Sequence, residues 1–251
     1  MVRDGLGWKV IGPDLEILAW AVAALPFARA AIAASKEAWR SGGTWFVGLD
    51  ALPNTEAGEI GGTPFPWPAL PLDAVPLHAA QLSTIRAGYP LRERGESDAA
   101  FHFRRDRDAA HLDGLLAVGP ARRRMLREPH AWILGLPLTD CGAGASPLVV
   151  WDGSAPIIHA ALKRAYADHP PERWGDIDVT GPYQAARREV FEQCRRIEVH
   201  VRPGEATLLH PMTIHGVAPW GVSAPVKVND DRIIAYFRPF SASVAEWMTL
   251  V

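Results

Sequence analysis

The chain has 251 residues, of which 48% are hydrophobic and 22% charged, and its net charge is −2. These values are ordinary for a soluble globular protein, and the small net charge gives no general reason to expect nucleic acid or an anionic membrane as a partner. The two cysteines, Cys141 and Cys194, form neither a zinc knuckle nor a disulfide framework, which favours a reducing, cytoplasmic setting. We expect one domain over 1–251 that acts on a small molecule; the sequence does not define the oligomeric state.

The first element expected is a helix in the apolar segment 15–40. Pro13 and Asp14 are typical of a helix start, because proline fits the first turn and acidic groups favour its positive end. A signal peptide would need positive charge before its apolar run, where Asp14 and Glu16 stand, and Pro26 and Arg29 interrupt the run. We therefore predict a buried or half-buried helix.

Short elements follow. Residues 42–54 indicate a strand and turn, 55–76 a long Gly/Pro-rich loop, and from about residue 99 short apolar runs alternate with turn signals. Alternating apolar residues on both sides of Pro203-Gly204 predict a hairpin, whereas 157–195 has helical periodicity. The predicted fold is mainly β with flanking helices: a double-stranded β-helix (jelly roll, cupin-like) core over about 77–240. The N-terminal helix and loop region 1–76 would pack on this core, and 157–195 would be a helical insertion.

The chemistry of the sequence starts at "RRDRDAAHLDGLL", residues 104–116. His111 and Asp113 are two residues apart before an apolar run, and on a strand such a pair would project from the same face. Two histidines and one carboxylate form the facial triad of non-haem Fe(II) oxygenases. His-x-Asp alone is a weak signal, and a solvated pair at a strand end is the simpler interpretation of it.

Later motifs add to this pair. His215 lies in "IHGVAPW" after the apolar run 206–210, and Arg232 opens the run "RIIAYFRP". His210 is the competing third ligand, although a lone histidine in an apolar strand is more often a core residue. Arg238 competes with Arg232 because both would lie on the same face of one strand.

This ordered set resembles the Fe(II)/2-oxoglutarate-dependent oxygenases, and among them the phytanoyl-CoA dioxygenase-like group, over roughly residues 99–240. The resemblance implies that His111, Asp113 and His215 are catalytic and hold Fe(II), and that Arg232 binds the distal carboxylate of 2-oxoglutarate. It implies a dioxygenase that uses O2, hydroxylates a small organic substrate and releases succinate and CO2. A planar guanidinium suits a carboxylate because it can form two parallel hydrogen bonds.

The sequence also departs from the family pattern. The spacing from His215 to Arg232 is long, which predicts an inserted loop over 221–231 near the site. The family's Gly-Ser-His is Gly153-Ser154-Ala155 here, which removes a polar group and weakens any inference about the substrate. Asp113 disfavours halogenation, because related halogenases have a small residue in its place.

Two other functions are compatible with the sequence. A cupin-like metal enzyme would use the same three ligands without 2-oxoglutarate, and a non-catalytic jelly-roll protein would only bind a ligand or partner. The arginines of 104–107 are candidates for meeting an anionic substrate at the pocket mouth, although solvation explains them as well. The basic stretch 121–128 is more simply a solvated surface than an anion site.

Overall fold

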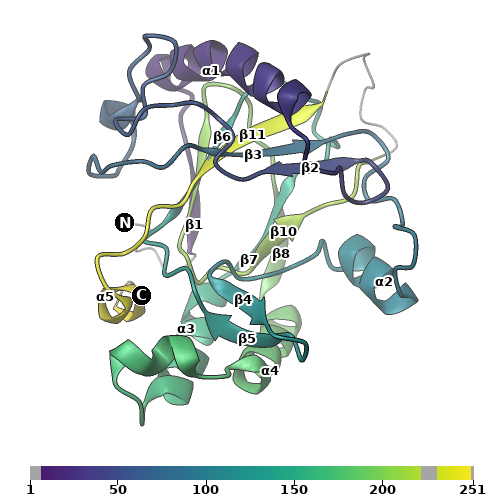
Figure 1. The fold of residues 1–251 in the computed structure, drawn as a ribbon, viewed down its shortest axis with the longest axis vertical. Coiled ribbons are helices and arrows are strands. Elements are labelled where there is room, and N and C mark those ends of the chain that lie inside the picture. Colours follow the sequence, from purple (N-terminus) through teal and green to yellow (C-terminus); the bar gives the residue numbers. More distant parts are fainter. Residues whose placement is uncertain (1–6, 222–230, 250–251) are drawn as a thin grey trace.

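The computed structural model describes residues 7–221 and 231–249, and its largest element is a six-stranded antiparallel sheet (Figure 1). The predicted loop at 221–231 lies almost entirely outside the described residues. In spatial order the strands are β1 (Trp8–Ile11), β9 (Ala206–Leu209), β6 (Ile133–Pro137), β11 (Arg232–Phe237), β3 (Gln81–Ile85) and β2 (Trp45–Gly48). Two strands from the first 76 residues, β1 and β2, therefore form the edges of this sheet.

A second sheet faces the first. It consists of β10 (His215–Val217), β7 (Leu148–Asp152) and β8 (Arg195–Val199), also antiparallel. An apolar cluster lies between the sheets, with Ile133 and Leu209 from the large sheet and Leu148, Val150 and Val199 from the small one. Because side chains alternate along a strand, this cluster defines the inner faces of both sheets.

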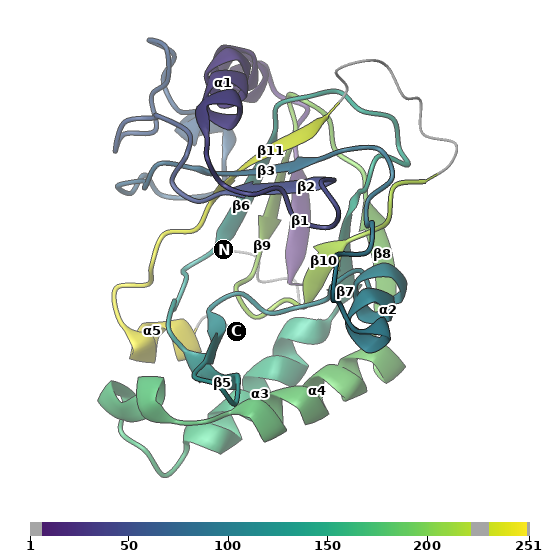
Figure 2. The same cartoon turned by 45° about the vertical axis from the view of Figure 1, so that its right-hand side comes forward.

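Helix α1 (Leu15–Ala34) covers the outer face of the large sheet (Figure 2). Its N-cap is Asp14, whose carboxylate accepts the backbone N–H groups of Glu16 and Ile17 at 2.7 and 3.2 Å. Trp20 is fully buried against the sheet, in edge contact with Phe237 of β11. By length and composition α1 could cross a membrane, with 28% of that window buried in the structure. The predicted buried or half-buried helix is confirmed over Leu15–Ala34, whereas residues 35–39 of the predicted segment are not helical.

Helices α3 (Ser154–Tyr166) and α4 (Thr180–Gln193) cover the outer side of the small sheet, as the periodicity of 157–195 predicts (Figure 2). They pack with Trp151 of β7 and with the hairpin β4 (Leu115–Val118)–β5 (Arg123–Leu126). The remaining elements are short: η1 (Trp67–Ala69), α2 (Asp98–Asp106), η2 (Pro171–Asp176) and α5 (Val244–Met248). The molecule is thus a pair of antiparallel sheets between two helical layers, which supports the predicted mainly-β fold with flanking helices.

Two local predictions are wrong. The chain does reverse at Pro203-Gly204, but β8 pairs with β7 and β9 pairs with β1 and β6, so the segments join different sheets. The turn residues specify the reversal, whereas burial between the sheets selects the strand partners. Residues 99–103, the first of the short apolar runs assigned to the β core, form part of helix α2 and not a strand. The helix begins after Ser97, whose hydroxyl accepts the N–H of Ala100.

Candidate metal centre

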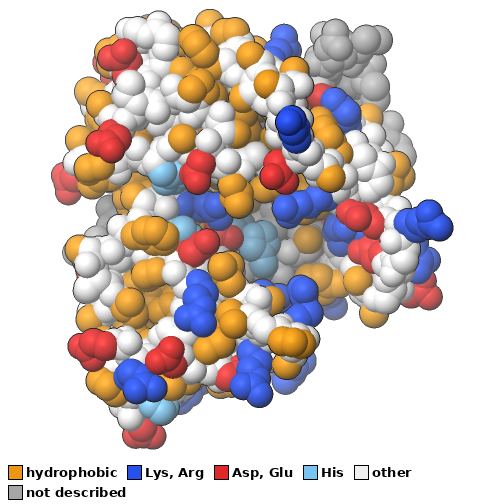
Figure 3. Space-filling model, in the orientation of Figure 1, with side chains coloured by type: hydrophobic (Ala, Val, Ile, Leu, Met, Phe, Trp, Pro, Cys, Tyr) orange, Lys and Arg blue, Asp and Glu red, His pale blue; other side chains and the backbone are white. Residues whose placement is uncertain are grey.

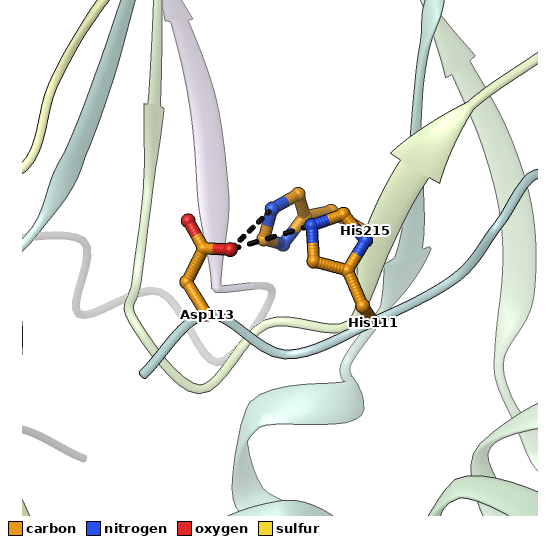
Figure 4. A group of neighbouring side chains, drawn as sticks. All are labelled: His111, Asp113 and His215. Atoms are coloured by element: carbon orange, nitrogen blue, oxygen red, sulfur yellow. Dashed lines mark ion pairs between the residues drawn. The ribbon is translucent and has the colours of Figure 1, made fainter. Parts of the chain in front are cut away.

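The structure brings His111, Asp113 and His215 together (Figure 4). One ligand atom from each lies within 4.8 Å of the other two. Asp113 Oδ1 is 3.3 Å from His111 Nε2 and 3.9 Å from His215 Nε2. Two imidazole nitrogens and one carboxylate oxygen converging in this way are the donor set of an Fe(II) facial triad, so the residues present fit that metal.

Backbone pairing places the two histidines side by side. His111 N–H donates to the carbonyl of His215 at 2.8 Å, and His215 N–H donates to the carbonyl of His111 at 3.1 Å. In each ring Nδ1 lies beside a carbonyl, that of Ala109 at 3.0 Å and that of Thr213 at 2.9 Å. A carbonyl only accepts, so Nδ1 carries the proton in both rings and Nε2 remains available for a metal.

Asp113 comes from a turn rather than from a strand. His111 forms an isolated bridge, the turn begins at Asp113, and β4 starts only at Leu115. Gly114 permits this turn: its φ is +89°, and a Cβ there would lie 2.4 Å from the carbonyl oxygen of Glu128. The two side chains therefore converge as predicted, but not because they share one face of a regular strand.

The electrostatics of the cluster favour the metal-binding forms of Asp113 and His215, whereas His111 must release the proton of its Nε2 before that nitrogen can ligate a metal. Burial, together with the charge of His111, lowers the pKa of His215 to about 4, so its ring is neutral at pH 7. Burial opposes ionisation of Asp113, but the hydrogen bond from His111 and the charges of His215 and Arg238 hold its pKa well below the usual range. Desolvation, the largest single cause, lowers the pKa of His111, but the hydrogen bond with Asp113, the charge of Asp113 and the hydrogen bond with the Ala109 carbonyl together outweigh it, so the net shift is upward.

An ion pair outside the triad fixes the segment that carries His111. Asp108 is buried and accepts two hydrogen bonds from Arg196 of β8, at 2.7 and 2.8 Å. Its carbonyl also accepts the N–H of Val217 at 2.9 Å. This approach requires glycine at 216, because a Cβ there would lie 2.1 Å from the same carbonyl oxygen. Asp108 thus connects the His111 segment to β8 through its carboxylate and to β10 through its carbonyl.

Arg238 is committed to the triad's carboxylate. Its Nη1 donates to Asp113 Oδ2 at 3.1 Å, and its Nη2 donates to Gln81. Since Oδ1 is the oxygen that faces the histidines, Arg238 holds the opposite oxygen of the same carboxylate. Arg238 is therefore a neighbour of the metal centre, and its charge is already offset.

Arg232 lies at the other end of β11. Ile233, Ala235 and Phe237 pack on the side of α1, so Arg232 points from the opposite face, toward the small sheet. Arg232 is buried, and its Nη1 has no hydrogen-bond partner among the described residues. It borders a cavity of about 350 Å³ together with Thr139 and Pro147. A buried, unpaired guanidinium nitrogen is costly unless an anion completes it, which fits a carboxylate ligand.

The other candidate residues are placed outside the centre. His210 accepts the N–H of Met212 through Nδ1 at 3.0 Å and does not belong to the cluster. Arg104 pairs with Glu96, Arg105 pairs with Asp106, and the guanidinium of Arg107 lies over the ring of Phe191. The basic stretch 121–128 contains β5, and two of its arginines donate to backbone carbonyls. These contacts account for the three arginines of 104–107 and for Arg124 and Arg127 without an anionic ligand.

Comparisons with known proteins agree with this geometry at the level of the fold. No family model and no curated protein matches the chain. Among solved structures, the non-heme α-ketoglutarate-dependent carbocyclase SnoK from nogalamycin biosynthesis matches with 15% identity and a TM-score of 0.50, covering 94% of this chain and 80% of that one. EctD from S. alaskensis with bound Fe matches with 16% identity and a TM-score of 0.45, covering 94% and 73%.

The SnoK match shows the fold. This fold is the one that the resemblance to the 2-oxoglutarate-dependent oxygenases implies, whereas the phytanoyl-CoA dioxygenase-like group stays a prediction. The sequence interpretation missed the contacts of Arg238 with Asp113 and of Arg196 with Asp108. The sequence does carry one signal for the contact of Arg238 with Asp113. Arg232 and Arg238 share a face of the chain but are six residues apart, so the two guanidinium groups lie at opposite ends of the site.

Proposed function

We propose that the chain is a cytoplasmic Fe(II)- and 2-oxoglutarate-dependent dioxygenase that hydroxylates a small organic substrate, on a double-stranded β-helix core. The observation that carries the proposal is the pairing of two features. A two-histidine, one-aspartate cluster has both Nε2 atoms directed at one carboxylate oxygen, and a buried arginine lies farther along the inner face with an unpaired nitrogen. When bound, Fe(II) and 2-oxoglutarate supply the oxidation, in which O2 is consumed, succinate and CO2 leave, and one oxygen atom enters a C–H bond.

The residues of this chain would hold and orient these groups. His111, Asp113 and His215 would ligate the metal, while Ala109 and Thr213 keep both imidazoles in the tautomer that exposes Nε2. Arg238 would orient Asp113 through the oxygen that does not face the histidines. The ligand set leaves room on the metal for other ligands, as the three-residue triad requires.

The position of Arg232 suits a short dicarboxylate that reaches the metal. In the small sheet His215 lies opposite Val150, and Val217 opposite Leu148. Pro147, which borders the Arg232 cavity, directly precedes Leu148. The cavity therefore starts about three strand residues, or roughly 10 Å, beyond the level of His215. Tyr89 also lies in this part of the molecule, and burial raises its pKa to about 12, so it is a neutral phenol within the field of Arg232.

The test is metal-dependent turnover of the cosubstrate. Purified protein supplied with Fe(II), ascorbate and 2-oxoglutarate should form succinate, at least by slow turnover without substrate. Asp113→Ala should abolish this formation, while the exposed His102→Ala should leave it unchanged. If the wild type neither binds nor consumes 2-oxoglutarate although it binds iron, the protein is instead a metal enzyme that uses no oxoacid. If it binds no divalent metal, the proposal is wrong.

A further inference from the structure

A cavity of about 700 Å³ lies next to the metal centre on the Asp113 side. Arg238, which donates to Asp113, forms part of its lining, and so does Glu128, whose backbone N–H bonds the carbonyl of Gly114 at 3.3 Å. In the view of Figure 3 a hollow crosses the middle of the molecule, and histidine and charged side chains gather in it. The volume falls within the range of small-molecule sites. We call this cavity the Phe240 pocket.

The walls of the Phe240 pocket are largely apolar. Leu49, Val75, Trp132 and Phe240 line it, and two of them are unusually exposed for large apolar side chains: Leu49 at 65% and Phe240 at 63%. The Phe240 ring stacks on that of His130, with an interplanar angle of 3° and centroids 5.4 Å apart. Exposed apolar side chains gathered at a concave site mark a surface that an apolar ligand would cover.

The charges of the pocket are mostly negative. Asp50, Glu128 and Glu246 line it, and the pKa of Glu128 is lowered by its hydrogen bond with His130. Arg238 is the one Lys or Arg in the lining, and Asp113 and Gln81 already occupy its terminal nitrogens.

Two of these carboxylates lie near histidines: Glu128 Oε2 is 3.3 Å from Nε2 of His130, and Asp50 Oδ1 is 3.5 Å from Nδ1 of His78. His78 itself brings no positive charge. Its Nε2 accepts the backbone N–H of Arg238 at 2.8 Å, and its Nδ1 lies 2.7 Å from the carbonyl of Ala79. This arrangement requires the neutral ring, with the proton on Nδ1. The pocket therefore offers carboxylates and apolar walls but no free cation among the described lining residues.

We propose that the Phe240 pocket is the substrate site and that its substrate is a small apolar molecule carrying an ammonium group, not a carboxylate or phosphate. This inference rests on the proposed function, since it takes the neighbouring triad as the reacting centre. The apolar body lies against Phe240 and Trp132, and the ammonium group faces Asp50 and Glu128. Anionic substrates are excluded by the same carboxylates.

The test uses two probes with the same phenylbutyl chain and oppositely charged head groups, on the full-length chain without added metal. These are 4-phenylbutyltrimethylammonium, whose quaternary nitrogen cannot ligate a metal, and 5-phenylpentanoate. Calorimetric titration should show the ammonium probe binding about tenfold more tightly, the sum expected from a few partly exposed charge contacts. Equal binding of the two probes, tighter binding of the carboxylate, or no binding of either would overturn the proposal.

Variants locate the binding. Phe240→Ala should weaken both probes by a similar factor, whereas Asp50→Asn with Glu128→Gln should remove the preference for the cation and keep the apolar contribution. Asparagine suits position 50, because the φ there is +48° and asparagine tolerates that region. Leu91→Ala and Asp168→Asn, exposed residues outside the pocket lining, are the controls and should change nothing.

If the controls weaken binding as much as the pocket variants, the site lies elsewhere. Because no metal is present, the result is independent of 2-oxoglutarate turnover. A chain that prefers the ammonium probe but forms no succinate would refute the proposed function and leave the pocket's ligand class standing.

Discussion

Arg232 opens β11 and Arg238 directly follows its last residue, on the same face of the extended chain, yet the surroundings of the two arginines differ. Arg238 meets Asp113 and Gln81 with both terminal nitrogens. Arg232 lies six residues away, roughly 20 Å along an extended strand; it is buried, and its Nη1 has no hydrogen-bond partner among the described residues. The difference shows that position on a strand face does not determine the role of an arginine; the nearest carboxylate does.

A guanidinium that already has a carboxylate partner stabilises the structure around it, whereas a buried one without a partner is available to a ligand anion. The pair Arg196–Asp108 is a third, purely structural case, since its carboxylate is buried and bound by two hydrogen bonds. Substitutions at these arginines and their partners should therefore separate cosubstrate binding from stability and metal affinity.

The largest effect is expected for Arg232→Ala. Loss of a charge-assisted, bidentate contact should weaken 2-oxoglutarate binding to the metal-loaded protein by about 100-fold. Metal affinity should remain within a factor of about 2, the range of unrelated surface changes. Calorimetric titration of 2-oxoglutarate measures the first quantity and competition with a metal-binding dye the second. Unchanged 2-oxoglutarate affinity would remove Arg232 from the site.

A smaller effect, on stability, is expected for Asp108→Asn. The change removes the charge that Arg196 binds twice, and asparagine can replace one acceptor at most. Because the Arg196 side chain is 40% exposed, water compensates in part, so we expect a loss of about 1–2 kcal/mol in the free energy of unfolding. Denaturant unfolding measures it, with the exposed Asp176→Asn as the control. A loss no larger than the control's would show that the pair does not hold the His111 segment.

Arg238→Gln should act on the metal rather than on the cosubstrate. Without the hydrogen bond to Oδ2, Asp113 is less well oriented, and loss of such an outer partner typically lowers metal affinity about tenfold. The affinity for 2-oxoglutarate, measured at saturating metal, should stay close to that of the wild type. The reverse pattern, with intact metal affinity and lost 2-oxoglutarate binding, would exchange the roles of the two arginines.

The smallest effect is expected for Arg105→Ala. Its partner Asp106 is exposed and adjacent in the chain, and surface pairs of this kind contribute little. The hydrogen bond from Arg105 lowers the pKa of Asp106 to about 2, so any stabilisation is present at neutral pH and is lost only as the pH falls from about 4 through 2. Thermal unfolding at pH 7 should be unchanged, as should succinate formation. A marked loss of turnover would restore the arginines of α2 as substrate contacts.

Local signals in the sequence predict several of these features correctly. The Asp14 cap starts α1, the periodicity of 157–195 gives α3 and α4, and the order His111, Asp113, His215 along the chain predicts three residues that do meet. Strand partners were not predictable in the same way. The turn at Pro203-Gly204 specifies a reversal, but the choice between hairpin and sheet-to-sheet crossing depends on burial between the two sheets.

The contacts that support the site join distant parts of the chain. Arg238 and Asp113 are 125 residues apart, and Arg196 and Asp108 are 88 apart. No spacing or periodicity connects such pairs, because they follow from how the strands are arranged around the inner apolar cluster. The sequence could therefore name the two competing arginines, but only the fold separates them.

A crystal structure of the protein grown anaerobically with Fe(II) and 2-oxoglutarate tests the central claim most directly. We predict a metal ion bound by Nε2 of His111, Nε2 of His215 and one oxygen of Asp113, with the distal carboxylate of 2-oxoglutarate on Arg232 and Arg238 still on Asp113. A distal carboxylate on Arg238, or a metal ion bound away from these three residues, would contradict the account.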